Sequence, residues 1–114
     1  MIKINSISGV VRYVKDVDAT AAFYENLGFR SKREADYATC YVNWFWVEFH
    51  KNEGAAPQAS EQLAVSVEGI DEFYEALVAK GIKPESEPQD QPWGRREFTV
   101  VDPDGYKLLF FKKK

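Results

Sequence analysis

The stretch PWGRREFTVVDPDGYKLLFF, residues 92–111, decides the fold, because it contains two strand-like runs joined by a tight turn. Residues 96–101 alternate with the two-residue period of a half-buried strand. The sequence Asp-Pro-Asp-Gly at 102–105 has the chemistry of a turn. Asp can bond its own backbone, Pro presets φ, and Gly accepts a left-handed backbone. Residues 106–111 then resume as a strand rich in aromatic and large aliphatic side chains.

The second half of the chain repeats a pattern of the first half. FYENL at residues 23–27 recurs as FYEAL at residues 73–77, fifty positions later. Both segments lie in apolar stripes with helical spacing, and a glycine follows each stripe, Gly28 and Gly81, where a left-handed C-cap is expected. Asp16 or Asp18 offers an N-cap for the first helix. The chain therefore contains a duplicated unit of one strand, one helix and further strands.

Strands are expected on both sides of each helix. In the first half they fall at residues 10–14, 29–34, 37–43 and 44–50, and in the second half at 62–67, 82–87, 96–101 and 106–111. The stretch NEGAAPQAS at 52–60 is small, polar and linker-like. We therefore predict an α+β protein with helices on one side of mostly antiparallel strands, built as one domain from modules 1–52 and 61–114 with a linker at 53–60.

The composition excludes several classes of protein. The chain has 114 residues, 45% of them hydrophobic and 29% charged, with a net charge of −3, which is typical of one globular domain. This charge argues against a nucleic-acid or anionic-membrane partner. No stretch approaches the roughly 20 apolar residues of a membrane span. The one cysteine, Cys40, fits a reducing compartment and a packing role. We therefore expect a cytoplasmic protein.

The expected strand at 44–50 presents two different faces, because side chains two positions apart point the same way. Its apolar face, with Phe45, Val47 and Phe49, should meet the helices. The other face carries two tryptophans, a glutamate and the one histidine of the chain: Trp44, Trp46, Glu48 and His50. We expect this face to line a cleft; the alternative is that the tryptophans are plain core. His50 is either an exposed polar residue or, with Glu48, an acid–base or metal-binding pair.

A second group of candidate residues lies in the stretch 93–97. Trp93 stands between Pro92 and Gly94 in a loop, where an exposed indole is costly unless it packs or binds, so we expect a ligand contact. The charged run Arg95-Arg96-Glu97 offers two alternatives, a grip on an anion or pairing on the surface.

The chain resembles the vicinal oxygen chelate superfamily, the glyoxalase/bleomycin resistance protein/dioxygenase group. The resemblance covers nearly the whole length and is carried by residues 18–29 (DATAAFYENLGF), 93–98 (WGRREF) and 102–106 (DPDGY). The segment 93–98 is similar to that of the bleomycin-resistance branch, with one extra arginine. The resemblance implies tandem βαβββ modules whose curved mixed sheets surround a cleft. It also implies a homodimer whose sites are often shared between chains.

Enzymes of this superfamily bind a divalent metal through four ligands on the first and last strands of each module. Carried over to this sequence, those positions fall on Gly9, Glu48, Gln62 and Leu109. Glycine and leucine cannot ligate, so two of the four remain and neither is a histidine. We therefore expect no metal cofactor, with Glu48, Gln62 and His50 as weak candidates for ligands.

Three functional hypotheses follow. The first is a non-catalytic binding protein that sequesters a planar, cationic small molecule, such as a bleomycin-like antibiotic, in an aromatic cleft. Its expected ligand-binding residues are Trp44, Trp46, Glu48, Gln62, Trp93 and Arg96. The alternative is a metal-dependent lyase, isomerase or dioxygenase of the same superfamily, and a third possibility is a drift to a partner-binding or structural role. Stacking and cation–π attraction on tryptophan contribute about 0.5–2 kcal/mol per contact, and the acidic net charge favours a cation.

Overall fold

The computed structural model describes residue 3, residues 5–54 and residues 61–114. The chain divides into two compact units, Met1–Ala56 and Pro57–Lys114, here called module 1 and module 2. The expected linker at 53–60 lies mostly outside the described residues, and residues 53 and 54 form a turn.

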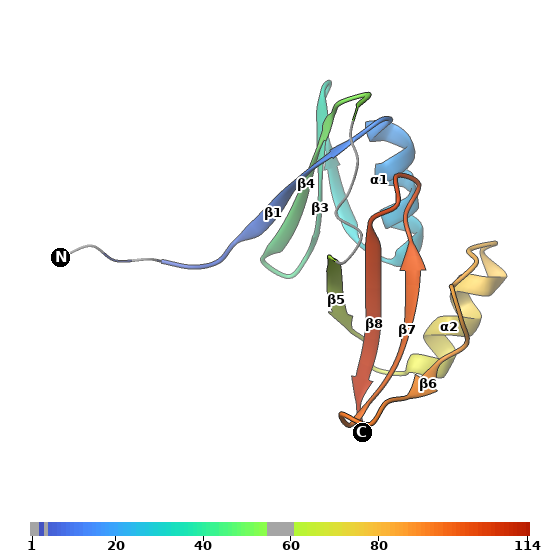
Figure 1. Cartoon of the computed structure of the whole chain (residues 1–114). Coiled ribbons are helices and arrows are strands. Elements are labelled where there is room, and N and C mark those ends of the chain that lie inside the picture. The colour runs from blue at the N-terminus through green and yellow to red at the C-terminus, as the bar shows by residue number, and fades with distance from the viewer. Residues whose placement is uncertain (1–2, 4, 55–60) are drawn as a thin grey trace. The chain divides into compact units, whose positions relative to one another are not determined.

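Module 1 contains one helix and a four-stranded mixed sheet (Figure 1). Its elements are β1 (Gly9–Val14), α1 (Val17–Leu27), β2 (Arg30–Arg33), β3 (Tyr37–Val42) and β4 (Phe45–Lys51). The strands lie in the order β1-β4-β3-β2. The pair β1–β4 is parallel and the other pairs are antiparallel.

Module 2 repeats this arrangement. Its elements are β5 (Gln62–Ser66), α2 (Ile70–Ala79), β6 (Gln89–Asp90), β7 (Arg95–Val101) and β8 (Lys107–Lys113). The order is β5-β8-β7-β6, again with one parallel pair, β5–β8. Both modules are therefore βαβββ units, and the predicted α+β class and internal repeat are confirmed.

Helix α1 begins and ends at the positions that its sequence favours. The side chain of Asp16 accepts a hydrogen bond from the backbone N–H of Ala19 at 3.0 Å, so Asp16 is the N-cap. Gly28 ends the helix at φ 110°, a backbone conformation that side chains disfavour. The fully buried Tyr24 packs its ring against those of Phe29 and Phe49, with centroids 5.2 and 4.8 Å away. This contact fixes which face of β4 turns toward the helix.

Helix α2 packs on its sheet through aromatic side chains. The ring centroids of Phe73 and Phe110 lie 4.8 Å apart, and those of Tyr74 and Phe98 lie 5.4 Å apart. The helix ends where Gly81 adopts φ 84° and the N–H of Ile82 returns to the carbonyl of Leu77. The helix therefore covers the face of β7 and β8 that carries Phe98 and Phe110.

The turn at residues 102–105 forms as predicted. The buried Asp102 carboxylate accepts hydrogen bonds from the backbone N–H groups of Asp104 and Tyr106, both at 2.9 Å. Gly105 has φ 98° and donates its N–H to the carbonyl of Asp102. The turn joins β7 to β8 in the register Val101 to Lys107.

One expected strand segment is wrong, and another begins one residue later than expected. Residues 82–87 form no strand, because Pro84 and Pro88 cannot donate to a ladder, and the short β6 lies instead at Gln89–Asp90. Strand β4 begins at Phe45, so Trp44 is not part of it. Asn43 and Trp44 make a two-residue turn after β3, with Asn43 at φ 56°, a conformation that asparagine tolerates.

Within the described part of the chain, neither helix combines the length and apolar character needed to cross a membrane.

Candidate functional site

In each module the helix packs on one face of the sheet, and the opposite face is not covered by that helix. In module 1, Val47 and Phe49 are buried on the helix side, so the alternate residues of β4 point away from α1. Strand register places them in rows with neighbours on β1 and β3. We call this surface the open face of module 1, and its members on these three strands are Gly9, Val11, Tyr13, Tyr37, Thr39, Tyr41, Trp46, Glu48 and His50.

Trp46 lies at the end of the open face where β1 begins. Its register partner there is Gly9, and its partner on β3 is Tyr41. A Cβ added to Gly9 would fall on the backbone oxygen and the indole ring of Trp46. The absence of a side chain at Gly9 therefore makes room for the Trp46 ring.

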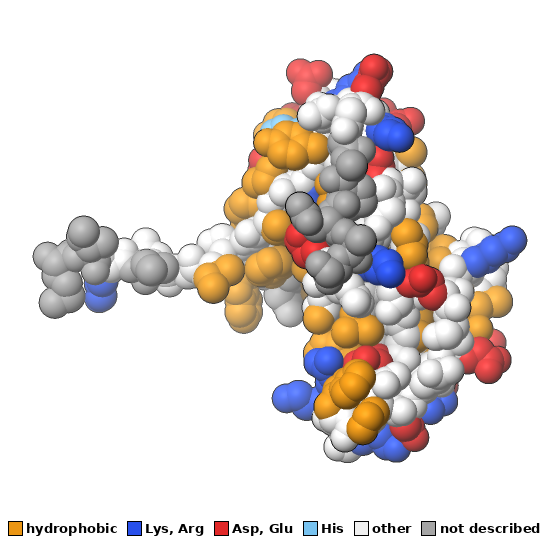
Figure 2. Space-filling view, in the orientation of Figure 1, with side chains coloured by type: hydrophobic (Ala, Val, Ile, Leu, Met, Phe, Trp, Pro, Cys, Tyr) orange, Lys and Arg blue, Asp and Glu red, His pale blue; other side chains and the backbone are white. Residues whose placement is uncertain are grey.

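Glu48 and His50 form an acidic and aromatic group further along the open face. The Nε2 atom of His50 lies 2.6 Å from Oε1 of Glu48. The imidazole stacks on the Tyr37 ring at 5.2 Å and 15°, and lies 6.1 Å from the Tyr13 ring. Figure 2 shows the histidine beside hydrophobic side chains at the surface. The group joins a carboxylate with partly exposed rings, a combination that attracts planar cations.

The open face of module 2 lies opposite Phe98 and Phe110. Register places Ala64, Thr99 and Leu109 in one row, with Gln62 beside Lys107 and Glu97 beside Phe111. Glu97 is 8% exposed. Its Oε2 accepts a hydrogen bond from Nε1 of Trp93 at 3.3 Å and lies 3.3 Å from Nε of Arg95. The Arg95 guanidinium lies 4.7 Å from the centroid of the Phe111 ring.

Arg96 lies on the helix side of β7 and away from this open face. It pairs with Asp71 of α2 at 3.0 Å and with Asp90 of β6 at 3.2 Å. The hydrogen bond to Asp71, which has the larger effect, and the hydrogen bond to Asp90 both raise the pKa of the Arg96 guanidinium above its usual range. Lys114 joins the same network through Asp90 at 2.7 Å. Within the charged run at 95–97, Arg95 therefore pairs with Glu97, while Arg96 pairs with acids outside the run.

The three tryptophans belong to different elements of the two modules. Trp46 lies on β4 in the open face of module 1, while Trp44 is 79% exposed in the turn that precedes β4. Trp93 belongs to module 2, in the turn between β6 and β7, and is 61% exposed. Only Trp46 and Glu48, among the six expected ligand-binding residues, share one open face with His50.

The residues at the expected metal positions do not fit a metal site. The Trp46 ring fills the space that a ligand side chain at position 9 would need, and Leu109 offers no donor atom. Among the described residues, no group of three or more His, Cys, Asp or Glu side chains is placed to hold a metal ion. The side chains at the four expected ligand positions therefore do not supply the three or four donor atoms that a transition-metal site needs.

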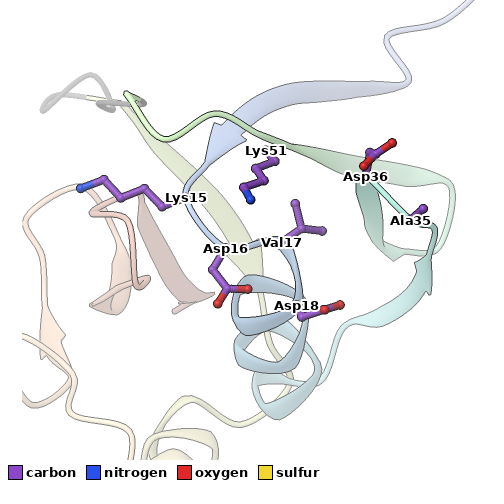
Figure 3. A pocket seen from close by; sticks show the side chains of 7 residues that line it. All are labelled: Lys15, Asp16, Val17, Asp18, Ala35, Asp36 and Lys51. Carbon is purple, nitrogen blue, oxygen red and sulfur yellow. The ribbon is translucent and has the colours of Figure 1, made fainter.

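A hollow of about 350 Å³ lies at the start of α1, lined by Lys15, Asp16, Val17, Asp18, Ala35, Asp36 and Lys51. Figure 3 shows the charged side chains spread around its rim rather than converging on one point. The Asp16 carboxylate is already engaged as the N-cap of the helix. We therefore look for candidate sites on the open face of each module and not in this hollow.

Cys40 lies on the helix side of β3 and is fully buried. Burial raises the pKa of its thiol to about 12, so it packs as a small apolar side chain.

Sequence reasoning missed the tyrosines that flank His50 and the contact between Glu97 and Trp93. The alternation within β1 and β3 indicates the face on which Tyr13 and Tyr37 lie. Their position beside His50 depends on strand register, which a single strand does not reveal.

Comparisons with known proteins agree with this architecture. The family model described as the glyoxalase/bleomycin resistance protein/dioxygenase superfamily matches residues 4–110. The bleomycin resistance protein of Klebsiella pneumoniae is 34% identical over 109 residues, covering 88% of this chain and 86% of that protein.

Solved structures of similar proteins lead to the same group. A bleomycin-binding protein complexed with bleomycin is 29% identical, with a TM-score of 0.75, covering 96% of this chain and 100% of that one. A bleomycin resistance determinant encoded on transposon Tn5 has a TM-score of 0.76 at 29% identity, covering 96% and 99% of the two chains. A protein from Nocardioides described as a glyoxalase/bleomycin resistance protein/dioxygenase shares the fold, with a TM-score of 0.81 at 22% identity over 99% of this chain and 86% of that one.

Proposed function

Because the chain belongs to the glyoxalase/bleomycin resistance protein/dioxygenase superfamily, we propose that it is a non-catalytic binding protein for a planar, cationic small molecule of the bleomycin class. The similarity to a bleomycin resistance protein along 88% of this chain supports the class of ligand. The similarity to a protein complexed with bleomycin supports binding as the activity.

The observation that carries the proposal is the composition of the open face of module 1. This face carries aromatic rings on all three strands and one carboxylate, Glu48, whose hydrogen-bond partner is His50. Stacking on such rings and cation–π attraction contribute about 0.5–2 kcal/mol each. A fixed carboxylate among them favours a positively charged ring system over a neutral one.

The metal-dependent alternative has less support. An enzyme of that type needs three or four donors in fixed geometry, and the first of its expected positions, Gly9, lies under the Trp46 indole. The open face of module 1 instead offers rings and a single carboxylate, which suit retention of a ligand better than bond cleavage.

The proposal includes a homodimer located in the cytoplasm. Small modules with exposed apolar side chains, such as Val11 at 46% and Tyr13 at 50%, gain from burial against a second chain. Light scattering at micromolar concentration should then give about twice the chain mass of 13.1 kDa.

The test is a titration of the purified protein with metal-free bleomycin, followed by tryptophan fluorescence and by calorimetry. Bound ligand should quench the fluorescence, and Trp46→Phe should remove most of that quenching. Trp44→Phe is the matched control, because Trp44 lies in the turn and outside the open face. Calorimetry and fluorescence that both stay unchanged at millimolar bleomycin would rule out this class of ligand.

A further inference from the structure

We propose that Glu97 is a positioning residue, which holds the Trp93 indole in a fixed orientation at the rim of the open face of module 2 so that the ring is ready for a ligand. The proposal rests on the proposed function for the identity of the ligand. The orientation of Trp93 is a property of the free protein and can be measured without any ligand.

The carboxylate of Glu97 is placed for such a role. It is 8% exposed, whereas the indole that it contacts is 61% exposed. A buried acid in the middle of β7 is costly unless its oxygens have partners. Its Oε2 atom accepts a hydrogen bond from Nε1 of Trp93 and forms an ion pair with Nε of Arg95, each at 3.3 Å. The indole N–H thus points back to the sheet, and its ring is left at the surface.

The carboxylate is itself held by its neighbours. Glu97 and Phe111 are register partners on β7 and β8. The guanidinium of Arg95 lies 4.7 Å from the centroid of the Phe111 ring, a cation–π distance. Arg95 is therefore held by the ring and the carboxylate together, and Glu97 links this pair to Trp93.

The backbone around Trp93 is already fixed by other bonds. The backbone N–H of Gly94 donates a hydrogen bond to the carbonyl of Gln91 at 3.1 Å. The N–H of Gln91 donates to the carbonyl of Arg95 at 2.8 Å. The N–H of Lys114 also donates to the carbonyl of Gly94 at 3.0 Å. The freedom that remains is the rotation of the Trp93 side chain, and the bond to Glu97 restricts that rotation.

A restricted ring improves binding because less rotamer entropy is lost when a ligand stacks on it. Loss of the restraint should therefore weaken binding while the turn and the sheet keep their structure. A purely structural role of Glu97 would instead change stability and leave the motion of the indole as it was.

The first experiment uses a chain in which Trp93 is the one remaining tryptophan, made with Trp44→Phe and Trp46→Phe. Glu97→Ala in this background should lower the fluorescence anisotropy of Trp93 and raise its quenching by acrylamide. Glu97→Gln, which keeps an acceptor oxygen, should lie closer to the parent. The matched control is Glu87→Ala, an exposed acid of the same module. Equal anisotropy in the Glu97→Ala protein and its parent would overturn the proposal.

The second experiment is a double-mutant cycle on the otherwise unchanged chain, with metal-free bleomycin as the probe. Trp93→Phe keeps an aromatic ring but removes the N–H donor, and because Trp93 is exposed it should fold. Trp93→Phe and Glu97→Ala should each weaken binding by about tenfold, and the pair should weaken it no more than the stronger single change. Effects that add in full would overturn the coupling. If bleomycin fails to bind while the anisotropy result holds, the proposed ligand is wrong and the positioning role stands.

Discussion

The indole of Trp46 on β4 lies over Gly9 on β1, its register partner in a parallel pair. The two residues are linked because the ring can occupy this place only when position 9 has no side chain. In the metal-binding pattern that the family resemblance implies, position 9 supplies a ligand. Here the same point of the sheet is used for an aromatic surface.

The first prediction concerns this contact. Gly9→Ala places a methyl group on the Trp46 ring and the backbone beneath it, and overpacking of this kind costs about 1–3 kcal/mol of stability. Urea unfolding with a tryptophan signal measures the loss. Gly54→Ala is the matched control, because a Cβ there meets one atom, the Asn52 Oδ1, at an ordinary 3.5 Å. Equal effects of the two variants would mean that the backbone and the Trp46 ring adjust at position 9 without cost.

The second prediction concerns metals. Purified protein should hold no stoichiometric transition metal, because Gly9 and Leu109 occupy two of the four expected ligand positions and Trp46 covers the first. Elemental analysis after dialysis against zinc, nickel or iron salts measures the content. About one metal per chain that disappears in Glu48→Ala would contradict the binding-protein proposal and favour the enzyme.

The sequence predicted the fold well because its signals are local. The helix caps Asp16 and Gly28 and the turn at 102–105 are short motifs whose backbone bonds form within a few residues, so a single sequence shows them. The placement of Trp44 in a strand was wrong for the opposite reason, because the hairpin turn that excludes it from β4 depends on how β3 and β4 pair.

The candidate site was predictable only in part. Alternation along β4 placed Trp46, Glu48 and His50 on one face. The ring stack around His50 and the bond from Trp93 to Glu97 depend on register and on side-chain orientation. Arg96 was expected near a ligand, but pairing across the sheet and with α2 engages it in ion pairs on the helix side.

A third prediction concerns Cys40. Because burial raises the pKa of its thiol to about 12, DTNB should react with the native protein at pH 8 only as fast as the protein opens, and at once in denaturant. A raised folded-state pKa also gives a contribution to stability that is complete below the ordinary thiol pKa of 9.0, which applies to the unfolded chain. That contribution is lost as the pH rises toward 12. Cys40→Ala should lack this part of the alkaline decline, measured as urea midpoints from pH 8 to 11.

A fourth prediction concerns the turn between β7 and β8. Asp102→Ala removes the acceptor of two backbone N–H groups, those of Asp104 and Tyr106. Buried donors left without a partner cost roughly 1–3 kcal/mol, so the thermal midpoint should fall clearly. Asp102→Asn retains one carboxamide oxygen and should cost less. Equal losses for the two variants would show that the charge of Asp102, and not its bonds to the turn, stabilises the hairpin.

The last prediction separates charge from shape on the open face of module 1. Glu48→Gln keeps the size of the side chain and an oxygen within reach of His50, but it removes the negative charge. If a cationic ligand binds beside Glu48, affinity for metal-free bleomycin should fall by roughly 1–3 kcal/mol, the usual worth of a charged hydrogen bond. Binding of a neutral aromatic compound of similar size should change little.

Salt dependence and a matched acid complete this test. A partly buried charge pair is screened less than an exposed one, so the difference between wild type and Glu48→Gln should persist at 0.5 M salt. Glu53→Gln makes the same chemical change at an acid with an 85% exposed side chain, 4.0 Å from Lys51, and should leave affinity within about 0.5 kcal/mol. If the two variants weaken binding equally, the attraction comes from the net charge of the protein, and Glu48 has no specific role in recognising the cation.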